Sequence, residues 1–372
     1  MKNQLLFLLA AFMLFSCQPN KQNAADSTAE EKTEKAENTE GTLLYPEEKH
    51  LANVRQLTFG GDNAEAYFSY NDEYLVLQRT HASEGIECDQ IFYGKIPTSA
   101  EEKFEMNLVS TGTGRTTCAF FLPGDEEIIF ASTHKADEAC PPTPDSRKIG
   151  KYVWPIYSSF ELFISDKEGN VKKQLTDNEF YDAEATLSPN GDKVVFTSTR
   201  DGDIELYTMD VDGSNVKRIT HEPGYDGGAF FSPDGSKLLF RASRFDNDSL
   251  LKEYQDLLAQ DLVTPSDMEL YICDVDGSNM QKITELGNAN WAPYFHPSGE
   301  KIIFCSNHSG GPRTFNLFMI NVDGTGLEQI TYDEQFDSFP MFSRDGSKLV
   351  FASNRNNGGT RETNVFIADW VE

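Results

Sequence analysis

The sequence lacks the motifs that assign chains to several common classes of enzyme and membrane protein. It contains no Gly-x-Ser-x-Gly nucleophile elbow and no His-Glu-x-x-His zinc motif. None of its six cysteines forms a Cys-x-x-Cys pair, so the usual zinc and thiol redox motifs are excluded. Beyond residue 15, no apolar run is long enough to cross a bilayer. The sequence therefore gives no sign of a serine peptidase domain or of a membrane-spanning helix.

Basic residues are also scarce, with 32 Lys and Arg against 60 Asp and Glu, which gives a formal net charge of −28. Only eight of the acids and four of the lysines fall in residues 18–50, so the rest of the chain is strongly acidic. An acidic body repels the phosphates of nucleic acids and of anionic membranes. We therefore expect no nucleic-acid partner, and a surface that favours cations or basic partners.

The N-terminus has the pattern of an export signal, because Lys2 precedes an apolar run at residues 5–15 that is too short to span a bilayer. The sequence Leu-Phe-Ser-Cys at residues 14–17 resembles a bacterial lipobox, which predicts cleavage before Cys17 and lipidation of its thiol. A plain secretory signal is the alternative. Because Gln18 follows the cysteine where Asp would favour retention in the inner membrane, we expect an outer-membrane lipoprotein that faces the periplasm or the surface.

Residues 18–50 show no apolar periodicity and cannot bury enough surface to offset the loss of chain entropy. We divide the chain into a signal peptide (1–16), a disordered tether that carries the lipidated Cys17 (17–50), and a folded body (51–372). The lipid would be the only contact with the membrane.

One phrase recurs six times in the folded body, and it predicts the architecture. Its fullest copy is Phe-Ser-Pro-Asp-Gly-Ser-Lys-Leu-Leu-Phe at residues 231–240, and the other copies start at Phe68, Phe121, Leu187, Phe295 and Phe342. Around one copy, four strands at 183–188, 193–198, 205–210 and 216–220 alternate with short turns. A repeat of 40–50 residues made of four strands is typical of β-propeller blades.

The phase of the repeat indicates how the ring closes. The body opens with a fourth strand at 54–58 and ends with a third strand at 365–370, so the last blade is complete only if these two strands pair. The sequence therefore predicts an all-β, six-bladed β-propeller closed by pairing of its N-terminal strand with its C-terminal blade. We expect a monomer.

The Ser-Pro-Asp-Gly turn, the Ser-x-Arg end of the second strand and the Asp-x-Asp-Gly turn resemble the repeat of TolB-type propellers. The resemblance covers residues 51–372 and implies the fold. TolB itself carries an α/β domain before its propeller, where this sequence has the tether. The chain looks most similar to lipid-anchored propeller proteins of the Bacteroidetes type, most of which have no assigned activity.

Extra loop length is confined to the loops between second and third strands, which all lie on one face, at 80–90, 133–159, 244–267, 307–315 and 355–362. Binding sites usually lie on such loops. Residues 248–263 predict a helix capped by Asp248 or Ser249, which either covers the rim of the propeller or acts as a lid or partner-binding element.

Three cysteines, Cys88, Cys118 and Cys140, map to this face in the first two blades. A disulfide between two of them is expected in an oxidising compartment, with a buried thiol or a thiol nucleophile as the alternatives. Cys273 and Cys305 fall inside strands and are expected to be core thiols.

Aligning the blades predicts two rings of polar residues on the loop-rich face. The first ring, at the mouth of the axial channel, comprises Asn63, Thr116, Asp182, Asp226, Asn290 and Asp337, with Glu65 and Glu184 two positions further on. No cofactor is required, but Asp182, Asp226 and Asp337 would suit Ca²⁺ or another hard cation on the axis. The alternative is that these residues cap turns.

The second ring comprises His81, His134, Arg200, Arg244, His308 and Arg355. These residues either pair with carboxylates of their own blades or, together with the first ring, bind a zwitterionic ligand. We interpret the chain as a non-enzymatic envelope propeller that binds a protein, a peptide or a peptidoglycan-like ligand on its loop-rich face. The alternative is a glycan- or peptide-directed hydrolase that uses Glu65 and Glu184. The sequence does not identify the ligand.

Overall fold

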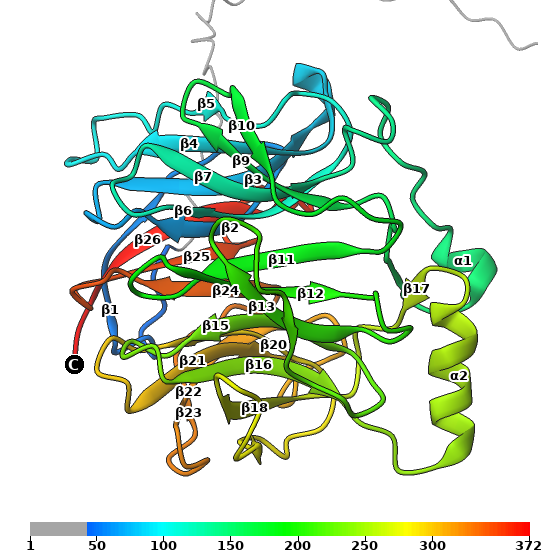
Figure 1. Cartoon of the computed structure of the whole chain (residues 1–372). Coiled ribbons are helices and arrows are strands. Elements are labelled where there is room, and N and C mark those ends of the chain that lie inside the picture. The colour runs from blue at the N-terminus through cyan, green and yellow to red at the C-terminus, as the bar shows by residue number, and fades with distance from the viewer. Residues whose placement is uncertain (1–42) are drawn as a thin grey trace, which may run out of the picture. The chain divides into compact units, whose positions relative to one another are not determined.

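The computed structural model describes residues 43–372, which contain six four-stranded antiparallel sheets arranged around an axis (Figure 1). The six-bladed propeller predicted from the repeat is confirmed. The predicted signal peptide, Cys17 and most of the predicted tether lie outside the described residues. In the part of the chain that the structure describes, no helix is long and apolar enough to cross a membrane.

The first three blades follow one another along the chain, each with its first strand next to the axis. Blade 1 consists of β2 (Asp62–Phe68), β3 (Tyr74–His81), β4 (Ile86–Lys95) and β5 (Asn107–Leu108). Blade 2 consists of β6 (Thr116–Phe121), β7 (Glu127–Ser132), β9 (Glu161–Asp166) and β10 (Val171–Gln174). Blade 3 consists of β11 (Asp182–Leu187), β12 (Lys193–Ser198), β13 (Glu205–Asp210) and β14 (Lys217–Arg218).

The last three blades repeat the pattern, and the sixth takes one strand from the start of the chain. Blade 4 consists of β15 (Asp226–Phe231), β16 (Lys237–Ser243), β18 (Met268–Asp274) and β19 (Gln281–Lys282). Blade 5 consists of β20 (Asn290–Phe295), β21 (Lys301–Ser306), β22 (Asn316–Asn321) and β23 (Glu328–Gln329). Blade 6 consists of β24 (Asp337–Phe342), β25 (Lys348–Ser353), β26 (Asn364–Trp370) and β1 (Leu51–Gln56).

Strand β1 closes the ring, as predicted. It pairs antiparallel with β26, with Leu51 opposite Trp370 and Gln56 opposite Phe366. The strand starts three residues earlier than the sequence pattern places it, because a bulge absorbs Asn53 at a φ of 51° and lets the residues before it join the ladder. Pairing on both sides of β26 leaves this strand without a free edge.

The recurring phrase joins neighbouring blades on the face opposite the insertions, which we call the plain face. A Cβ atom on Gly191 would lie 2.1 Å from Cγ of Pro123 in the previous blade, so this turn requires glycine. Where Tyr70 replaces the proline in blade 1, Asp125 of blade 2 accepts hydrogen bonds from the backbone N–H groups of Tyr70 and Asn71 at 2.6 and 3.0 Å. The phrase is therefore a structural element of blade packing.

Residues 43–50, which the sequence assigns to the tether, lie against blade 6. The side chains of Glu48 and Arg355 are both fully buried, and Arg355 Nη2 lies 2.8 Å from Glu48 Oε1. The same guanidinium also pairs with Asp337, and its Nη1 donates to the carbonyl oxygen of Leu43 at 2.9 Å. The segment is polar in composition and was therefore assigned to the tether, but a long-range ion pair holds it on the propeller.

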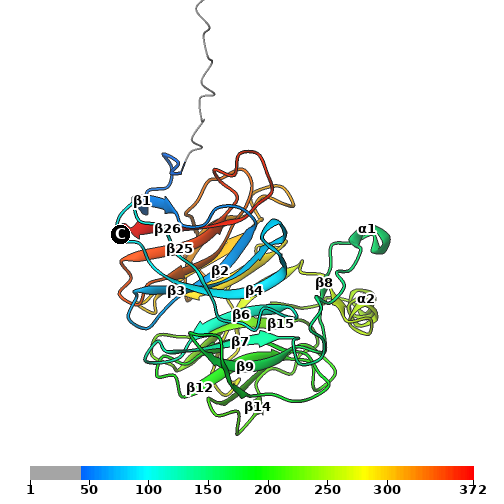
Figure 2. The same cartoon turned by 90° about the horizontal axis from the view of Figure 1, so that it is seen from above.

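The insertions between second and third strands lie on one face (Figures 1 and 2). They hold η1 (Ala82–Glu84), α1 (Ser146–Ile149), β8 (Trp154–Pro155), α2 (Asp248–Leu258) and β17 (Leu262–Val263). Helix α2 is five residues shorter than predicted, and Asn247, not Asp248 or Ser249, caps its N-terminus. Its last predicted residues instead form β17, which pairs with β8 of the blade 2 insertion.

Candidate functional site

The first predicted ring is not exposed at the mouth of the channel. Asn63, Thr116, Asp182, Asp226, Asn290 and Asp337 are all 0 % exposed, at the start of the inner strands. Each lies inside its own blade, where side chains and backbone groups surround it. The placement of these residues at the channel mouth was therefore wrong, because a bulge directly after this position changes the direction of each inner strand.

The second ring explains the first. In blades 3, 4 and 6 the buried aspartate forms an ion pair with the arginine 18 positions later, in Asp182–Arg200, Asp226–Arg244 and Asp337–Arg355. In the other three blades the neutral residues Asn63, Thr116 and Asn290 accompany His81, His134 and His308. Charge is thus matched blade by blade, which is the pairing that the sequence left open against ligand binding. His134 and His308 each lie over a phenylalanine of their own blade, with ring centroids 4.4 and 4.5 Å apart.

These ion pairs separate the three aspartates that the sequence grouped as metal ligands. Each carboxylate is bound by the arginine of its own blade, and the three pairs belong to three different blades. Among residues 43–372, no three His, Cys, Asp or Glu side chains form a group that could hold a metal ion. The aspartates contribute to blade structure in three separate places.

The residues that surround the axis occupy a bulge two positions further along each inner strand. This axial ring consists of Glu65, Cys118, Glu184, Gly228, Ala292 and Phe339, all with a φ between 43° and 60°. All six are partly exposed, although most of their neighbours in the strands are buried. Because the strained backbone recurs in every blade it belongs to the architecture, and only the side chains of the ring are specific to this chain.

Arg241 fills the place left open by Gly228. A Cβ atom on Gly228 would lie 1.8 Å from Arg241 Nη1, and one on Gly227 would lie 2.4 Å from Glu184 Oε2. The guanidinium therefore passes over Gly228 and completes the ring in blade 4, and Gly227 makes room for the Glu184 carboxylate. The sequence analysis did not single out Arg241. The signal that could have identified it is a charged residue at a position that is uncharged in the other five blades (Gln78, Ala131, Thr197, Cys305 and Ala352).

The two glutamates predicted to line the channel both belong to the axial ring, but they differ in their partners. Glu184 pairs with Arg241 and accepts hydrogen bonds from Thr197 Oγ1 at 2.8 Å, from the Gly228 N–H at 2.9 Å and from the Tyr225 hydroxyl at 3.1 Å. Within residues 43–372, Glu65 accepts one hydrogen bond, from the Cys118 thiol, with Sγ 2.9 Å from Oε2. Glu184 is saturated, and Glu65 has no cationic partner among the described residues.

This difference appears in the pKa values. Burial, and then the charge of Glu184, raise the pKa of Glu65 to about 7. The pKa of Glu184 is lowered, because the charge and hydrogen bond of Arg241 outweigh the effect of burial. Burial and the two glutamates raise the pKa of the Cys118 thiol well above its usual value, which argues against the thiolate nucleophile.

Glu65→Gln is expected to change how stability depends on pH. Because the pKa of Glu65 is raised in the folded state, its contribution to stability is complete below the pKa of the unfolded chain and is lost as pH rises through about 7. The free energy of unfolding of the variant, relative to that of wild type, should therefore increase by roughly 2 kcal/mol when the pH is raised from about 5 to about 8. Urea denaturation at the two pH values measures this. Exposed Glu179, changed to Gln, is the matched control, and equal pH profiles for all three proteins would contradict the assignment.

A layer of aromatic side chains closes the axis below the ring. Tyr67 of blade 1 and Phe230 of blade 4 meet with ring centroids 5.8 Å apart, and Phe120 and Tyr294 pack against Phe230 at 6.4 and 5.1 Å. Blades 1 and 4 face each other in a six-bladed ring, so this contact spans the axis. The layer lies on the plain-face side of the axial ring, so a ligand of the ring would have to approach from the loop-rich face.

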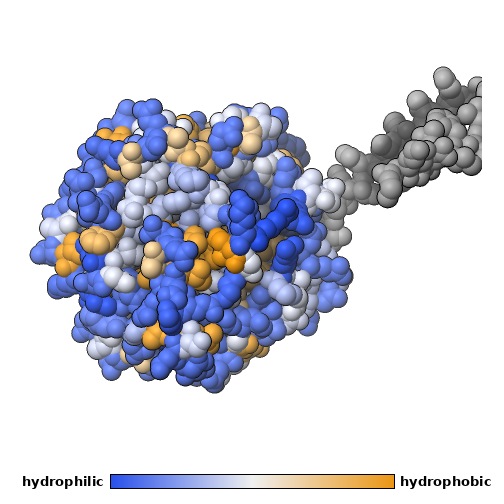
Figure 3. All heavy atoms as spheres, turned by 90° about the vertical axis from the view of Figure 1, so that its right-hand side faces the viewer, coloured by the Kyte–Doolittle hydropathy of each residue, from blue (hydrophilic) through white to orange (hydrophobic). Residues whose placement is uncertain are grey.

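The insertions of blades 2 and 4, residues 133–159 and 244–267, meet over blade 3, and together we call them the arch. Strands β8 and β17 pair, Lys151 and Glu253 form an ion pair, and the N–H of Ile156 donates to the carbonyl oxygen of Asp261 at 2.7 Å. Trp154 of the arch lies 5.8 Å from the guanidinium carbon of Arg241, measured to the ring centroid. Figure 3 shows this face, where apolar surface forms separate patches among polar side chains.

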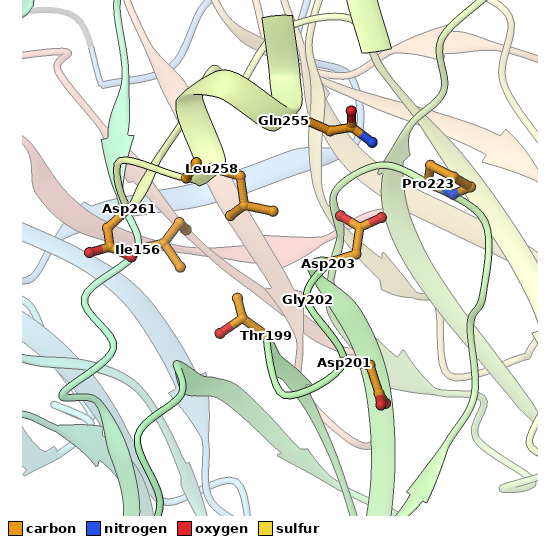
Figure 4. Close-up of a pocket in the computed structure, with 10 residues that line it drawn as sticks. Ile156, Thr199, Asp201, Gly202, Asp203, Pro223, Gln255, Leu258 and Asp261 are labelled. Carbon is orange, nitrogen blue, oxygen red and sulfur yellow. The ribbon is translucent and has the colours of Figure 1, made fainter. Parts of the chain in front are cut away.

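A partly open cavity of about 370 Å³ lies between the arch and the loop of blade 3, which has no insertion of its own (Figure 4). Ile156 and Leu258 form apolar parts of its wall, and Asp201 and Asp203 form its acidic part. Asp203 accepts hydrogen bonds from the Tyr254 hydroxyl of α2 and, at 3.1 Å, from the Gly224 N–H. Its carboxylate therefore serves to seat α2 on the propeller.

Two of the three cysteines on this face form a disulfide. Cys88 of β4 is bonded to Cys140 of the blade 2 insertion, with Cα atoms 6.0 Å apart. Cys118 is free and belongs to the axial ring, and Cys273 and Cys305 are buried free thiols, as predicted. The disulfide fixes the start of the arch to blade 1.

Comparison with known proteins bears on the fold and the family. A family model described as "TolB beta propeller domain" matches residues 143–269 and 258–366. The structure of putative TolB from Agrobacterium tumefaciens is similar, with a TM-score of 0.55 and 19 % identity over 84 % of this chain and 91 % of that chain. TolB from Acinetobacter baumannii is similar with a TM-score of 0.50 and 17 % identity over 83 % of this chain, which spans 63 % of that protein. No protein of curated function matches the sequence. At these identities the structural likeness shows the fold alone.

Proposed function

The chain belongs to the TolB beta propeller domain family, and from this premise we propose that it is a binding propeller of the cell envelope that takes its ligand on the loop-rich face. The proposal rests on where the features that differ from the repeat lie in the structure. The arch, the disulfide and the distinctive side chains of the axial ring all lie on one face, whereas the plain face repeats the same turns. In a rigid scaffold, such a concentration of irregular loops marks the binding surface.

The ligand class that we propose is a protein, a peptide or a peptidoglycan-like fragment. The axial ring supports this choice, because it presents a carboxylate in Glu65 and a guanidinium in Arg241, and these groups bind ammonium and carboxylate groups. The aromatic ring of Trp154, which belongs to the arch, lies beside Arg241 and adds an apolar contact for a peptide chain.

Site-specific photo-crosslinking in envelopes tests this function. A crosslinking residue at Tyr152, which is 65 % exposed on the arch, should capture a ligand. The matched control is Met280, which is 36 % exposed in a plain-face turn, and it should capture none. Capture from Met280 alone, or equal capture at both positions, would contradict the proposal.

A hydrolase is the second candidate, because one observation favours it. The ring holds one carboxyl group with a raised pKa and one with a lowered pKa, in Glu65 and Glu184, which is the division between general acid and ionised partner found in glycosidases. Against it, Glu184 is fully engaged by Arg241 and three further donors. If wild type hydrolyses peptidoglycan fragments and Glu65→Gln does not, the result would support a hydrolase. If wild type shows no turnover of these fragments, the hydrolase proposal is contradicted.

The location that we propose is the outer membrane, with lipidated Cys17 as the anchor. The family and the Cys88–Cys140 disulfide support an oxidising envelope compartment. The lipobox-like residues 14–17 and Gln18 support lipidation and the outer membrane. Labelled fatty acid should be incorporated into wild type and not into Cys17→Ala, and equal labelling would contradict lipidation at this residue.

A further inference from the structure

Two groups of opposite charge in the axial ring have unused bonding capacity. Glu65 of blade 1 accepts only the Cys118 thiol among the described residues. Arg241 of blade 4 uses Nη2 to bind Glu184 and Tyr225, whereas within residues 43–372 its buried Nε has no hydrogen-bond partner. Its side chain is only 7 % exposed, so leaving the Nε–H group without an acceptor costs free energy.

The positions of these groups define what can satisfy them. Blades 1 and 4 face each other, so the carboxylate and the guanidinium approach the axis from opposite sides. Cys118 and Glu184 lie between them on one side, and the apolar residues Ala292 and Phe339 lie between them on the other. The aromatic layer formed by Tyr67, Phe120, Phe230 and Tyr294 closes the axis below.

Closure of the axis restricts the ligand to an end group. A chain cannot pass through the layer, because the rings of Tyr67 and Phe230 meet across it. The group that reaches the ring must therefore enter from the loop-rich face and stop there. It needs a positive charge for Glu65, an acceptor for Arg241, and a small apolar part that suits Ala292 and Phe339.

We propose that the axial ring binds the zwitterionic head of an α-amino acid, with its ammonium group on Glu65 and its carboxylate on Arg241. This inference rests on the proposed function in that the ligand approaches the loop-rich face, and it specifies the chemistry read at the centre of that face. The same head occurs in a free amino acid and at the end of a larger ligand, such as a peptide that carries a lysine linked through its ε-amino group.

Isothermal titration of the full chain with alanine tests the recognition of both charges. Alanine should bind, while N-acetylalanine, which lacks the ammonium group, and alaninamide, which lacks the carboxylate, should bind at least about tenfold more weakly. Glu65→Gln should weaken alanine binding by a similar factor, and Glu179→Gln, which changes an exposed acid, should leave it unchanged. Equal affinity for alanine and both analogues, or unchanged binding by Glu65→Gln, would overturn the proposal.

A second arm separates the two sources of the head group. A peptide with an ε-linked lysine should bind more tightly than alanine if the arch contacts the rest of the ligand, and more weakly if the site takes only free amino acids. Ala292→Leu, which fills the ring without altering a charge, should abolish binding of both probes in a protein whose thermal unfolding is unchanged. Failure of both probes to bind wild type overturns the inference, whereas crosslinking at Tyr152 would then still support the broader binding function.

Discussion

Arg355→Met is expected to lower the free energy of unfolding by about 3–5 kcal/mol, the range found when a buried ion pair loses one partner. Arg355, Glu48 and Asp337 have fully buried side chains, and the arginine is the cation of both carboxylates. The variant leaves two buried carboxylates close together without a positive charge. The midpoint of urea denaturation measures the loss.

Two further variants identify the cause of that loss. Arg361→Met changes an exposed arginine of the same blade and should shift stability by less than about 0.5 kcal/mol. Combining Arg355→Met with Glu48→Gln and Asp337→Asn should recover part of the loss, because no buried charge remains. If the triple variant is no more stable than Arg355→Met, lost packing rather than unpaired charge is responsible.

Arg241→Met is expected to be nearly as destabilising, by about 3 kcal/mol or more, because Glu184 then loses its cation inside the propeller. Adding Glu184→Gln should restore most of this stability, since the remaining amide can still accept from Thr197 and from the Gly228 N–H. A double-mutant cycle in urea measures the coupling between the two residues. Additive losses would show that the two side chains act independently and would contradict the buried pair.

Gly228 offers a separate check on that pair. Gly228→Ala places a methyl group 1.8 Å from the present position of Arg241 Nη1, whereas Gly202→Ala introduces alanine at a similar positive φ with no atom within 4 Å. Both variants strain the backbone, so the difference between them reports the displaced guanidinium.

The fold was predictable because each blade closes over short distances in the sequence. Four strands and three turns recur within 40–50 residues. The folded body begins with a fourth-strand pattern and ends with a third-strand pattern, which predicted that β1 pairs with β26. The position of residues 43–50 could not be predicted from the repeat, because they lie outside it. Glu48 has its partner 307 positions away, and nothing in its neighbourhood distinguishes it from exposed Glu47.

The candidate site was predictable only in part, for a geometric reason. Counting along the repeat placed Glu65 and Glu184 near the channel. The same count placed Asp182 and Asp226 at the channel mouth, whereas in the structure both are buried inside their blades. A bulge turns each inner strand between the two positions, and such a turn cannot be read from residue spacing. Arg241 reaches the ring from the second strand of blade 4, across Gly228, so a count along the inner strands does not find it.

The contacts of Arg355 also determine how the propeller responds to mechanical load. Residues 43–50 precede β1, so tension applied at residue 43 is borne first by Leu43 and Glu48 on the guanidinium, and only afterwards by the ladder between β1 and β26. The buried ion pair lies in series with the closing strand and takes the force before it. A pull on the start of the folded chain would therefore have to break this contact before it could begin to unzip the ring.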